Sequence, residues 1–473
     1  MEDIKQHKKP GIIYPTIVVF SILIVLLMIP ERISFFDDGL NFNLSLIAIV
    51  NVLIFWSGVK KTYKSWLRFD TLFLIGYLIV HTQIPFLASI GIEPERPSFV
   101  WINKNVVNYA SWISTMALLL WLLGYLLFMR RNQKPKKQAF KKYTVSSKSI
   151  NNIMVLLFLL FLGLVGTDFL GGNYKGTENW GSGATYVFLL LQVVLYLNII
   201  YFFINTKNLS FSNILKVAIN NKALFGVTAS YVILFLLIGD RGPVMQVGIL
   251  ILGGYTLYQK PITFVQLFTL MAIGAFVFTL IGLGRSRLLS NDDSNILVRG
   301  YKNLATESSG FNPTNELAAS NRILYRAIDV VPYKHPHLYG LTMFTELIGV
   351  IPFGGSTFIN ITNLPKMYYS SSLFFTIIGQ GSLYTYGEGS EIIGDLYINI
   401  GIYGALIVMF FFGYFISFFS IKAVFTKQHT YIIIYLLLLI TAIYLNRSHI
   451  LMPLKFIVYA LIVDRLLTKR VYE

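Results

Sequence analysis

The sequence predicts an all-α membrane protein whose helices cross a bilayer many times. Of its 473 residues, 55% are hydrophobic and only 13% are charged, whereas soluble domains carry about 25% charged residues. Apolar runs recur from one end of the chain to the other, and a β-barrel would instead show short alternating segments. These observations exclude a soluble enzyme held by one anchor. The chain has no cysteine, which excludes a disulfide framework and a thiolate metal site.

The apolar runs divide into about twelve candidate spans, because a helix needs about 20 apolar residues to cross the hydrocarbon core. The first run follows the basic segment "KQHKKP", is too long for a signal-peptide core and lacks a small-residue cleavage site. We therefore expect it to be retained as a span. The predicted spans are residues 11–29, 40–58, 69–91, 109–129, 150–170, 185–204, 224–239, 243–259, 262–283, 392–418, 430–445 and 450–467.

Lysine-rich loops predict the orientation, since cytoplasmic loops carry an excess of Lys and Arg. The segments "KKTYKSWLR", "RRNQKPKKQAFKKYTVSSK" and "RLLTKR" all lie inside if both termini are cytoplasmic. The chain then divides into residues 1–283 with spans one to nine, a long extracytoplasmic loop domain at 284–391, and residues 392–473 with the last three spans. We expect the protein to lie in the cytoplasmic (inner) membrane, with most of its net charge of +17 carried by loops on the cytoplasmic side. The sequence contains no soluble basic domain that could bind nucleic acid.

Arginine is concentrated on the outer side, although lysine is the commoner cation inside. The planar guanidinium binds phosphate bidentately and stays charged. Pairing with outer acids or with lipid headgroups would explain the same residues without a ligand. The outer arginines are Arg32, Arg96, Arg241, Arg285, Arg287, Arg299, Arg322, Arg326 and Arg447.

The loop domain is predicted to hold amphipathic helices. In "FNPTNELAASNRILYRAIDVVP", Asn312 caps a helix that Pro313 begins and Pro332 ends. Arg322 and Arg326, four residues apart, share one face of this helix. A second amphipathic stretch is "GLTMFTELIGVIPF". Both suit the membrane surface or the roof of a cavity, although a solvated loop domain would hold such helices equally well. The apolar face of the first comprises Leu317, Leu324, Ala327, Ile328 and Val331, and Glu316 lies in its first turn.

Acidic residues gather at the outer mouth of the tenth span. Glu388, Glu391 and Asp395 lie in "GEGSEIIGD", and a helix would place Glu391 and Asp395 on one face. Such acids can also simply mark the membrane interface. The short loop "NRSH" holds Arg447 and His449 at the same boundary. A histidine there can be catalytic or a structural hydrogen-bonding group.

The segment "LLIGDRGPVMQVG" places Asp240 and Arg241 between two apolar runs. Its glycines and proline form a turn or begin the next helix. Asp240 can hold Arg241 in place and offset part of its burial. Arg285, Arg287 and Arg447 can converge on the same mouth. Such a cluster has the charge that a lipid-linked pyrophosphate requires.

These motifs, taken together, resemble the bacterial oligosaccharide repeat-unit polymerases, the Wzy-type polymerases of O-antigens, capsules and exopolysaccharides. The resemblance runs from about residue 225 onward. It rests on the "GDRGP" turn, the outer loop opening with "GRSR", the stretch "NELAASNRILYRAIDVVPYKHPHLYGLTMFTELIGVIP" and "GSEIIGDLYINIGIYG" at the head of a late span.

The related O-antigen ligases place a His-Asn pair eleven residues before a Gly-x-x-Gly. Here the glycines are Gly401 and Gly404, and the equivalent positions hold Ser390 and Glu391. The missing histidine favours a polymerase over a ligase.

The resemblance implies a glycosyltransferase that needs no metal and no soluble cofactor. A growing glycan on undecaprenyl diphosphate is the donor, and a lipid-linked repeat unit is the acceptor, with a chain-length regulator and a flippase as expected partners. We expect Glu391 to be the general base, with His449 as the second candidate, and Arg241 to stabilise the leaving diphosphate. The residues expected to bind diphosphate or glycan are Arg285, Arg287, Arg299, Arg322, Arg326, Arg447, Glu316, Glu388, Asp395 and Asp240.

Two other functions remain open from the sequence. A polyprenyl-phosphate-sugar glycosyltransferase would use paired acids to bind a metal, and "ISFFDDG" offers Asp37 and Asp38. A lipid-linked oligosaccharide flippase would show internal repeats and charges deep within its spans. No repeat is evident, and the charges within spans are few: Lys455, Asp70 and Asp464.

Overall fold

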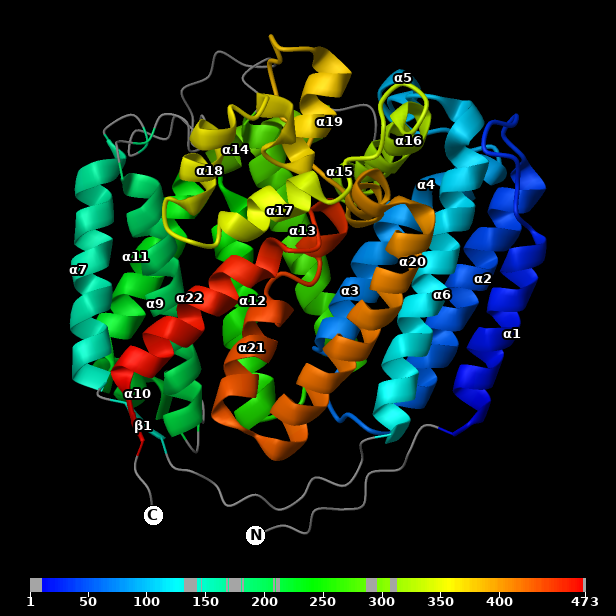
Figure 1. The fold of residues 1–473 in the computed structure, drawn as a ribbon. Helices are drawn as coiled ribbons and strands as arrows, with labels where there is room; N and C mark the ends of the chain where they lie inside the picture. The colour runs from blue at the N-terminus through cyan, green and yellow to red at the C-terminus, as the bar shows by residue number, and fades with distance from the viewer. Residues whose placement is uncertain are drawn as a thin grey trace.

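The computed structural model describes residues 11–131, 143–145, 147–166, 169, 180, 183–206, 209, 213–285, 296–306 and 313–470. Across these residues the protein is a bundle of long helices with shorter helices covering one end (Figure 1). The predicted all-α fold is confirmed, with the addition of one pair of three-residue strands. Single turns of 3₁₀- or π-helix carry the label η.

The helices before the loop domain are α1 (Ile13–Leu27), α2 (Asp38–Lys60), α3 (Phe69–Tyr77), η1 (Leu78–Thr82), α4 (Gln83–Ser89), α5 (Pro97–Val100), η2 (Lys104–Val106), α6 (Val107–Arg131), α7 (Ser147–Val165), α9 (Ala184–Asn205), α10 (Ile214–Asn220), α11 (Lys222–Ile238), α12 (Arg241–Tyr258) and α13 (Phe264–Arg285). The predicted loop domain, whose boundaries stay a prediction, contains α14 (Ile296–Thr306), α15 (Asn315–Ala318), η5 (Ala319–Asn321), α16 (Arg322–Val330), α17 (Leu341–Ile348), α18 (Gly354–Thr362), η6 (Lys366–Tyr368) and α19 (Ser371–Gln380). The last part holds α20 (Ile392–Ile421), η7 (Lys422–Thr426), α21 (His429–Leu439), η8 (Tyr444–Arg447) and α22 (Met452–Leu467).

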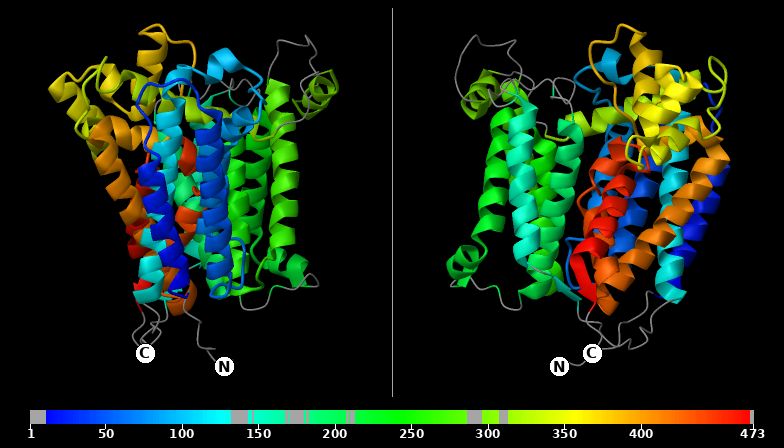
Figure 2. Two further views of the ribbon diagram at one scale, coloured as in Figure 1. Left: turned by 90° about the vertical axis from the view of Figure 1, so that its right-hand side faces the viewer. Right: turned by 60° about the vertical axis from the view of Figure 1, so that its left-hand side comes forward.

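Different secondary-structure elements lie at the two ends of the bundle. Helices α14 to α19 gather at one end, which we call the loop end (Figures 1 and 2). At the opposite end, β1 (Tyr143–Val145) pairs antiparallel with β2 (Thr468–Arg470), so that Tyr143 faces Arg470. We call this the strand end. The pairing brings together two of the segments that the lysine-rich loops predict to share one side of the membrane.

Each of the twelve predicted stretches contains a helix in its described residues. By length and composition, six helical segments can cross a membrane: Asp38–Lys60, Phe69–Ser89, Lys104–Arg130, Ala184–Asn205, Phe264–Gly284 and Ile392–Thr426. Further apolar helices, among them α1, α11 and α21, are shorter than this. The total of twelve crossings stays a prediction.

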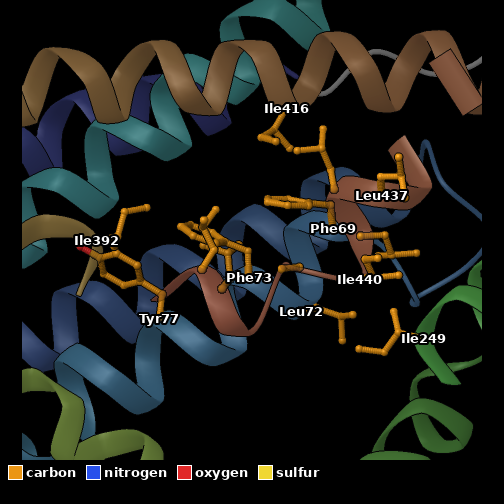
Figure 3. Packing of buried hydrophobic residues seen from close by; sticks show 14 of the residues in the cluster. Phe69, Leu72, Phe73, Tyr77, Ile249, Ile392, Ile416, Leu437 and Ile440 are labelled. Atoms are coloured by element: carbon orange, nitrogen blue, oxygen red, sulfur yellow. The ribbon is translucent and has the colours of Figure 1, made fainter. Parts of the chain in front are cut away.

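Helices α6 and α20 approach each other closely along their length. A Cβ atom on Gly124 would lie 2.0 Å from the carbonyl oxygen of Phe410, and one on Gly413 would lie 2.1 Å from that of Trp121. Small residues are what allow helix backbones to pack this tightly in membranes. Around this contact, Figure 3 shows Phe69 and Phe73 of α3 in the core that α20 covers.

Helix α13 stands at the edge of the bundle (Figure 2). Only 11% of its apolar window is buried, against 83% for the window containing α6. Its outward side chains are apolar, which suits a helix surrounded by lipid. The loop-end helix α14 crosses it closely, because a Cβ on Gly300 would lie 1.9 Å from the carbonyl oxygen of Leu280.

Two predicted helices are broken in the structure. The eleventh predicted stretch continues only to Leu439, and residues 440–451 form turns and η8. The predicted helix after Pro313 is divided into α15, η5 and α16, its predicted cap Asn312 lies outside the described residues, and Thr314 makes no side-chain cap bond. The predicted end of the helix before Pro332 is confirmed.

We predict that Gly413→Ala lowers the free energy of unfolding by about 1–3 kcal/mol, because its Cβ would overlap the α6 backbone. Thermal unfolding in detergent measures the change. The control is Gly163→Ala in α7, where a Cβ meets nothing within 4 Å and a helical alanine is favoured by about 0.5–1 kcal/mol. Equal stability of the two variants would contradict the close α6–α20 contact.

Candidate functional site

The "GDRGP" turn joins α11 to α12 at the loop end. Gly239 ends α11 in the left-handed region with φ 82°, and Asp240 caps α12 by accepting a bond from the Gly242 amide at 3.1 Å. Helix α12 begins with Arg241. The predicted turn and helix start are therefore confirmed.

Arg241 contacts Glu316 of α15 and the backbone of α13, and the expected support from Asp240 stays a prediction. Its Nη2 donates to the Glu316 oxygens at 2.7 and 3.0 Å, and its Nη1 donates to the carbonyl oxygen of Phe278 at 2.8 Å. Arg447 Nη1 lies 3.5 Å from the same carboxylate. We call Arg241, Glu316 and Arg447 the open arginine cluster, because their side chains are 20%, 58% and 36% exposed.

The open arginine cluster carries a net positive charge. Burial alone would raise the pKa of the Glu316 carboxyl, but Arg241 and Arg447 lower it below its usual range. Glu316 is therefore ionised at neutral pH, and one carboxylate faces two guanidinium groups. Guanidinium groups that remain partly in water can accept a second, stronger anion such as phosphate.

A second group, the buried arginine cluster, contains Arg322, Arg326 and Glu388. Arg322 contacts one Glu388 oxygen, and Arg326 Nη2 lies 3.8 Å from the other, to which Gln380 Nε2 also donates at 3.1 Å. The ring of Phe99 lies 4.0 Å below the Arg322 guanidinium. The side chains of Arg322, Arg326 and Glu388 are 8%, 14% and 2% exposed. The cluster therefore ties α16 to α19 and to the start of α20, and the two arginines share one helix face as predicted.

Glu391 caps α20. Its two carboxylate oxygens accept bonds from the Ile393 and Gly394 amides, each at 2.7 Å, and His81 Nε2 lies 3.1 Å away. The Glu391 side chain is completely buried. In this structure the carboxylate is occupied as a helix cap, and the expected role of Glu391 as the general base stays a prediction.

His449 lies between two carboxylates. Its Nδ1 contacts Glu346 of α17, and the amide of the next residue, Ile450, donates to Asp395 at 3.3 Å. His449 is 26% exposed and Glu346 12%. We call His449, Glu346 and Asp395 the histidine group. Glu346 was not among the predicted site residues, and its only sequence signal is its position inside the amphipathic stretch "GLTMFTELIGVIPF".

Of the remaining predicted site residues, Arg299 has a described side chain. It lies on α14, and its Nε is buried without a hydrogen-bond partner among the described residues. Arg285 ends α13, but its side chain lies outside the described residues, as does the whole of Arg287. Their convergence on Arg241 stays a prediction. Arg32 donates to the carbonyl oxygens of Ile328 and Val331 and thereby holds the end of α16.

Three of the acids named for the alternative functions have structural partners. Asp37 caps α2 through the Leu40 amide at 2.9 Å. Asp70 pairs with Arg68 at 2.8 Å, and Asp464 pairs with His429 at 2.7 Å. Within the described ranges, no three His, Cys, Asp or Glu side chains gather as a metal site.

The fold and the site together define a helical integral membrane protein with arginines and acids gathered at one end. A family model described as O-antigen polysaccharide polymerase Wzy matches residues 12–468. The chain therefore belongs to the Wzy O-antigen polymerase family, as the sequence motifs predict. Members are multi-pass inner-membrane proteins that act on lipid-linked oligosaccharide repeat units, and polymerisation is a glycosyl transfer in general kind. Comparisons with curated proteins and with solved structures give no match.

We predict that Glu391→Ala lowers the free energy of unfolding by about 0.5–2 kcal/mol, because two amides lose their cap. Thermal unfolding measures this. The control, Glu93→Gln, breaks a half-exposed pair with Lys104 and should change stability by about 0–1 kcal/mol. Unchanged stability together with abolished chain extension would contradict a purely capping role and support Glu391 as the base.

Proposed function

We propose that this protein polymerises undecaprenyl-diphosphate-linked repeat units into O-antigen, capsule or exopolysaccharide at the outer face of the cytoplasmic membrane. Family membership supports repeat-unit polymerisation. The open arginine cluster is the observation that carries the rest of the proposal, because it presents two partly exposed guanidinium groups at the loop end.

The open arginine cluster suits the diphosphate of a lipid-linked glycan. Arg241 and Arg447 come from different elements and meet at Glu316, whose carboxylate occupies the position that a phosphate oxygen would take. A bound diphosphate carries more charge than one carboxylate and would bind both guanidinium groups bidentately. The buried arginine cluster is less suited, since its guanidinium groups are already desolvated on Glu388.

The proposed reaction is one displacement at the anomeric carbon of the donor. An acceptor hydroxyl oxygen forms the new bond to this carbon while the bond from the carbon to the phosphate oxygen breaks. Undecaprenyl diphosphate leaves with the bonding electrons, and the hydroxyl proton passes to a base on the protein. Arg241 and Arg447 stabilise the charge that develops on the leaving diphosphate. We propose no metal in this step, and the four acids Glu316, Glu388, Glu346 and Glu391 each contact arginine, histidine or backbone amides.

The proposed orientation places the loop end outside and both termini in the cytoplasm. Support comes from β1, which lies in the lysine-rich loop and pairs with β2 at the opposite end from the open arginine cluster. A flippase would deliver the lipid-linked units to this side, and a chain-length regulator would act there as a partner.

Lysine substitution tests the diphosphate site. We predict that Arg241→Lys and Arg447→Lys each slow chain extension about 10²–10³-fold, because lysine keeps the charge but loses the bidentate fork. The measurement is the length distribution of lipid-linked glycan at matched protein level. Arg96→Lys, at an exposed position before α5, should leave the ladder unchanged. If both site variants gave the wild-type distribution of glycan lengths, Arg241 and Arg447 would be surface ion-pair residues and not a diphosphate site.

Cysteine labelling tests the orientation in a chain that has no native cysteine. A cysteine at Ser448 should react with a membrane-impermeant reagent in intact cells, and one at Lys137 should react only after permeabilisation. Labelling at position 137 in intact cells would reverse the proposed orientation.

A further inference from the structure

Helix α17 presents a polar face to the bundle and an apolar face outward. Thr342 and Thr345 are buried, whereas Phe344 and Leu347 are 49% and 48% exposed. Such a helix lies along a membrane interface with its apolar side in the lipid. Glu346 lies four residues after Thr342, so both side chains belong to the inward face.

The start of α17 is fixed to a break in α20. Gly401 has φ 70°, which interrupts the helix and deprives the carbonyl groups before it of their intrahelical donors. The amides of Leu338 and Gly340 replace them, donating to Ile398 at 2.8 Å and to Asn399 at 3.1 Å. The positive φ also explains why a glycine stands at this position.

The two helices match each other in steps of four residues. Thr342 of α17 exchanges hydrogen bonds with the Asn399 side chain at 2.8 and 3.0 Å. One turn earlier in α20, Asp395 accepts from the Asn399 amide nitrogen. One turn later in α17, Glu346 contacts His449. The hydrogen bonds that align α17 with α20 therefore also fix the position of Glu346 beside the imidazole of His449.

We propose that Glu346 orients His449 and that His449 accepts the proton of the acceptor hydroxyl. This inference rests on the proposed polymerase function and deepens it. Nδ1 is the nitrogen in contact with Glu346, so Nε2 is the nitrogen left to take the proton, and no bond from Nε2 to another described residue is present. As the hydroxyl oxygen bonds to the anomeric carbon, its proton moves to Nε2 and gives an imidazolium beside Glu346. Glu346 is a positioning residue, and His449 is the catalytic base.

The surroundings of His449 make the reaction rate depend on pH in a defined direction. The charged groups that face it are Glu346 from α17 and Asp395 from α20, while Arg447 in the same segment points to Glu316. Burial alone lowers the pKa of His449, but Glu346 and Asp395 outweigh burial and raise it. The neutral, proton-accepting form therefore grows as pH rises through the raised pKa. Chain extension should rise with pH over the same range.

The test compares pH profiles of chain extension for purified full-length variants. Glu346→Gln removes the charge beside His449. The pH range over which the rate of chain extension rises should therefore shift to lower pH by about 1 unit or more, and the maximum rate should fall. Glu346→Asp keeps the charge at a longer reach and should lower the rate with this pH range nearly unmoved. His449→Ala should slow extension about 10²–10⁴-fold and remove the rise with pH. The control Glu93→Gln removes a loop-end carboxylate that pairs with Lys104 and should alter neither quantity.

Binding of a short polyprenyl diphosphate separates this inference from the proposed function. Glu346→Gln should bind it as the wild type does, whereas Arg241→Lys should bind it more weakly. If folded Glu346→Gln shows the same rise of rate with pH as the wild type, the inference is overturned, but the proposed polymerase function is not. If Glu346→Gln fails to fold, a wild-type rate in Glu346→Asp would overturn it and a reduced rate would support it. Absence of chain extension by the wild-type protein would instead overturn the proposed function.

Discussion

The first turn of α20 is the point to which the buried arginine cluster and the histidine group are attached. Glu388, just before it, holds two arginines of α16, Glu391 caps its amides, and Asp395 within it accepts the amide of Ile450. The helix itself is fixed by the close backbone contact with α6 at Gly413. Two segments that are remote in sequence, α16 and the segment before α22, are therefore attached to one helix end. A displacement of α20 would move the arginines, the histidine and their acids together.

Exposure separates the two arginine clusters that the sequence presents as equivalent. In the buried arginine cluster, removing Glu388 would leave desolvated cations without a partner, which is strongly destabilising. In the open arginine cluster, water reaches Glu316 and both guanidinium groups, so exchange of the carboxylate for a phosphate leaves no charge unpaired. The same composition of two arginines and one glutamate thus suits attachment of α16 in one place and a ligand in the other.

The sequence predicted the features that depend on interactions between residues close together in the chain. The four-residue spacing of Arg322 and Arg326 gave their common face, and the glycines and proline of "GDRGP" gave the turn. The pairing of Arg241 with Glu316 joins residues 75 positions apart, and that of Arg447 with Glu316 joins residues 131 apart. No spacing rule reaches such contacts.

Helix breaks were the second kind of feature that the sequence did not predict. Glu391 was assigned to the same helical face as Asp395, but its backbone is extended at φ −146°, which turns the carboxylate onto the helix amides. Within an apolar run, the end of α21 at Leu439 carries no strong breaker before it. There the break follows from tertiary contacts, since buried Asn446 donates to the backbone of Phe73 at 3.1 Å.

The break after α21 explains how polar chemistry can lie within an apolar bundle. Helix α21 has 11 residues, about 16 Å of rise, which is short of the roughly 30 Å hydrocarbon core. Irregular backbone at that depth is tolerated only where protein surrounds it, and Thr441, Ala442, Leu445 and Asn446 are indeed fully buried. The chain leaves this buried segment carrying Arg447 and His449 two residues apart. Arg447 belongs to the open arginine cluster and His449 contacts Glu346, so one short segment carries both a proposed diphosphate-binding residue and the proposed base. A polymerase that transfers glycan from one lipid carrier to another requires this proximity, because the bond to the leaving diphosphate breaks at the same carbon that the deprotonating hydroxyl attacks.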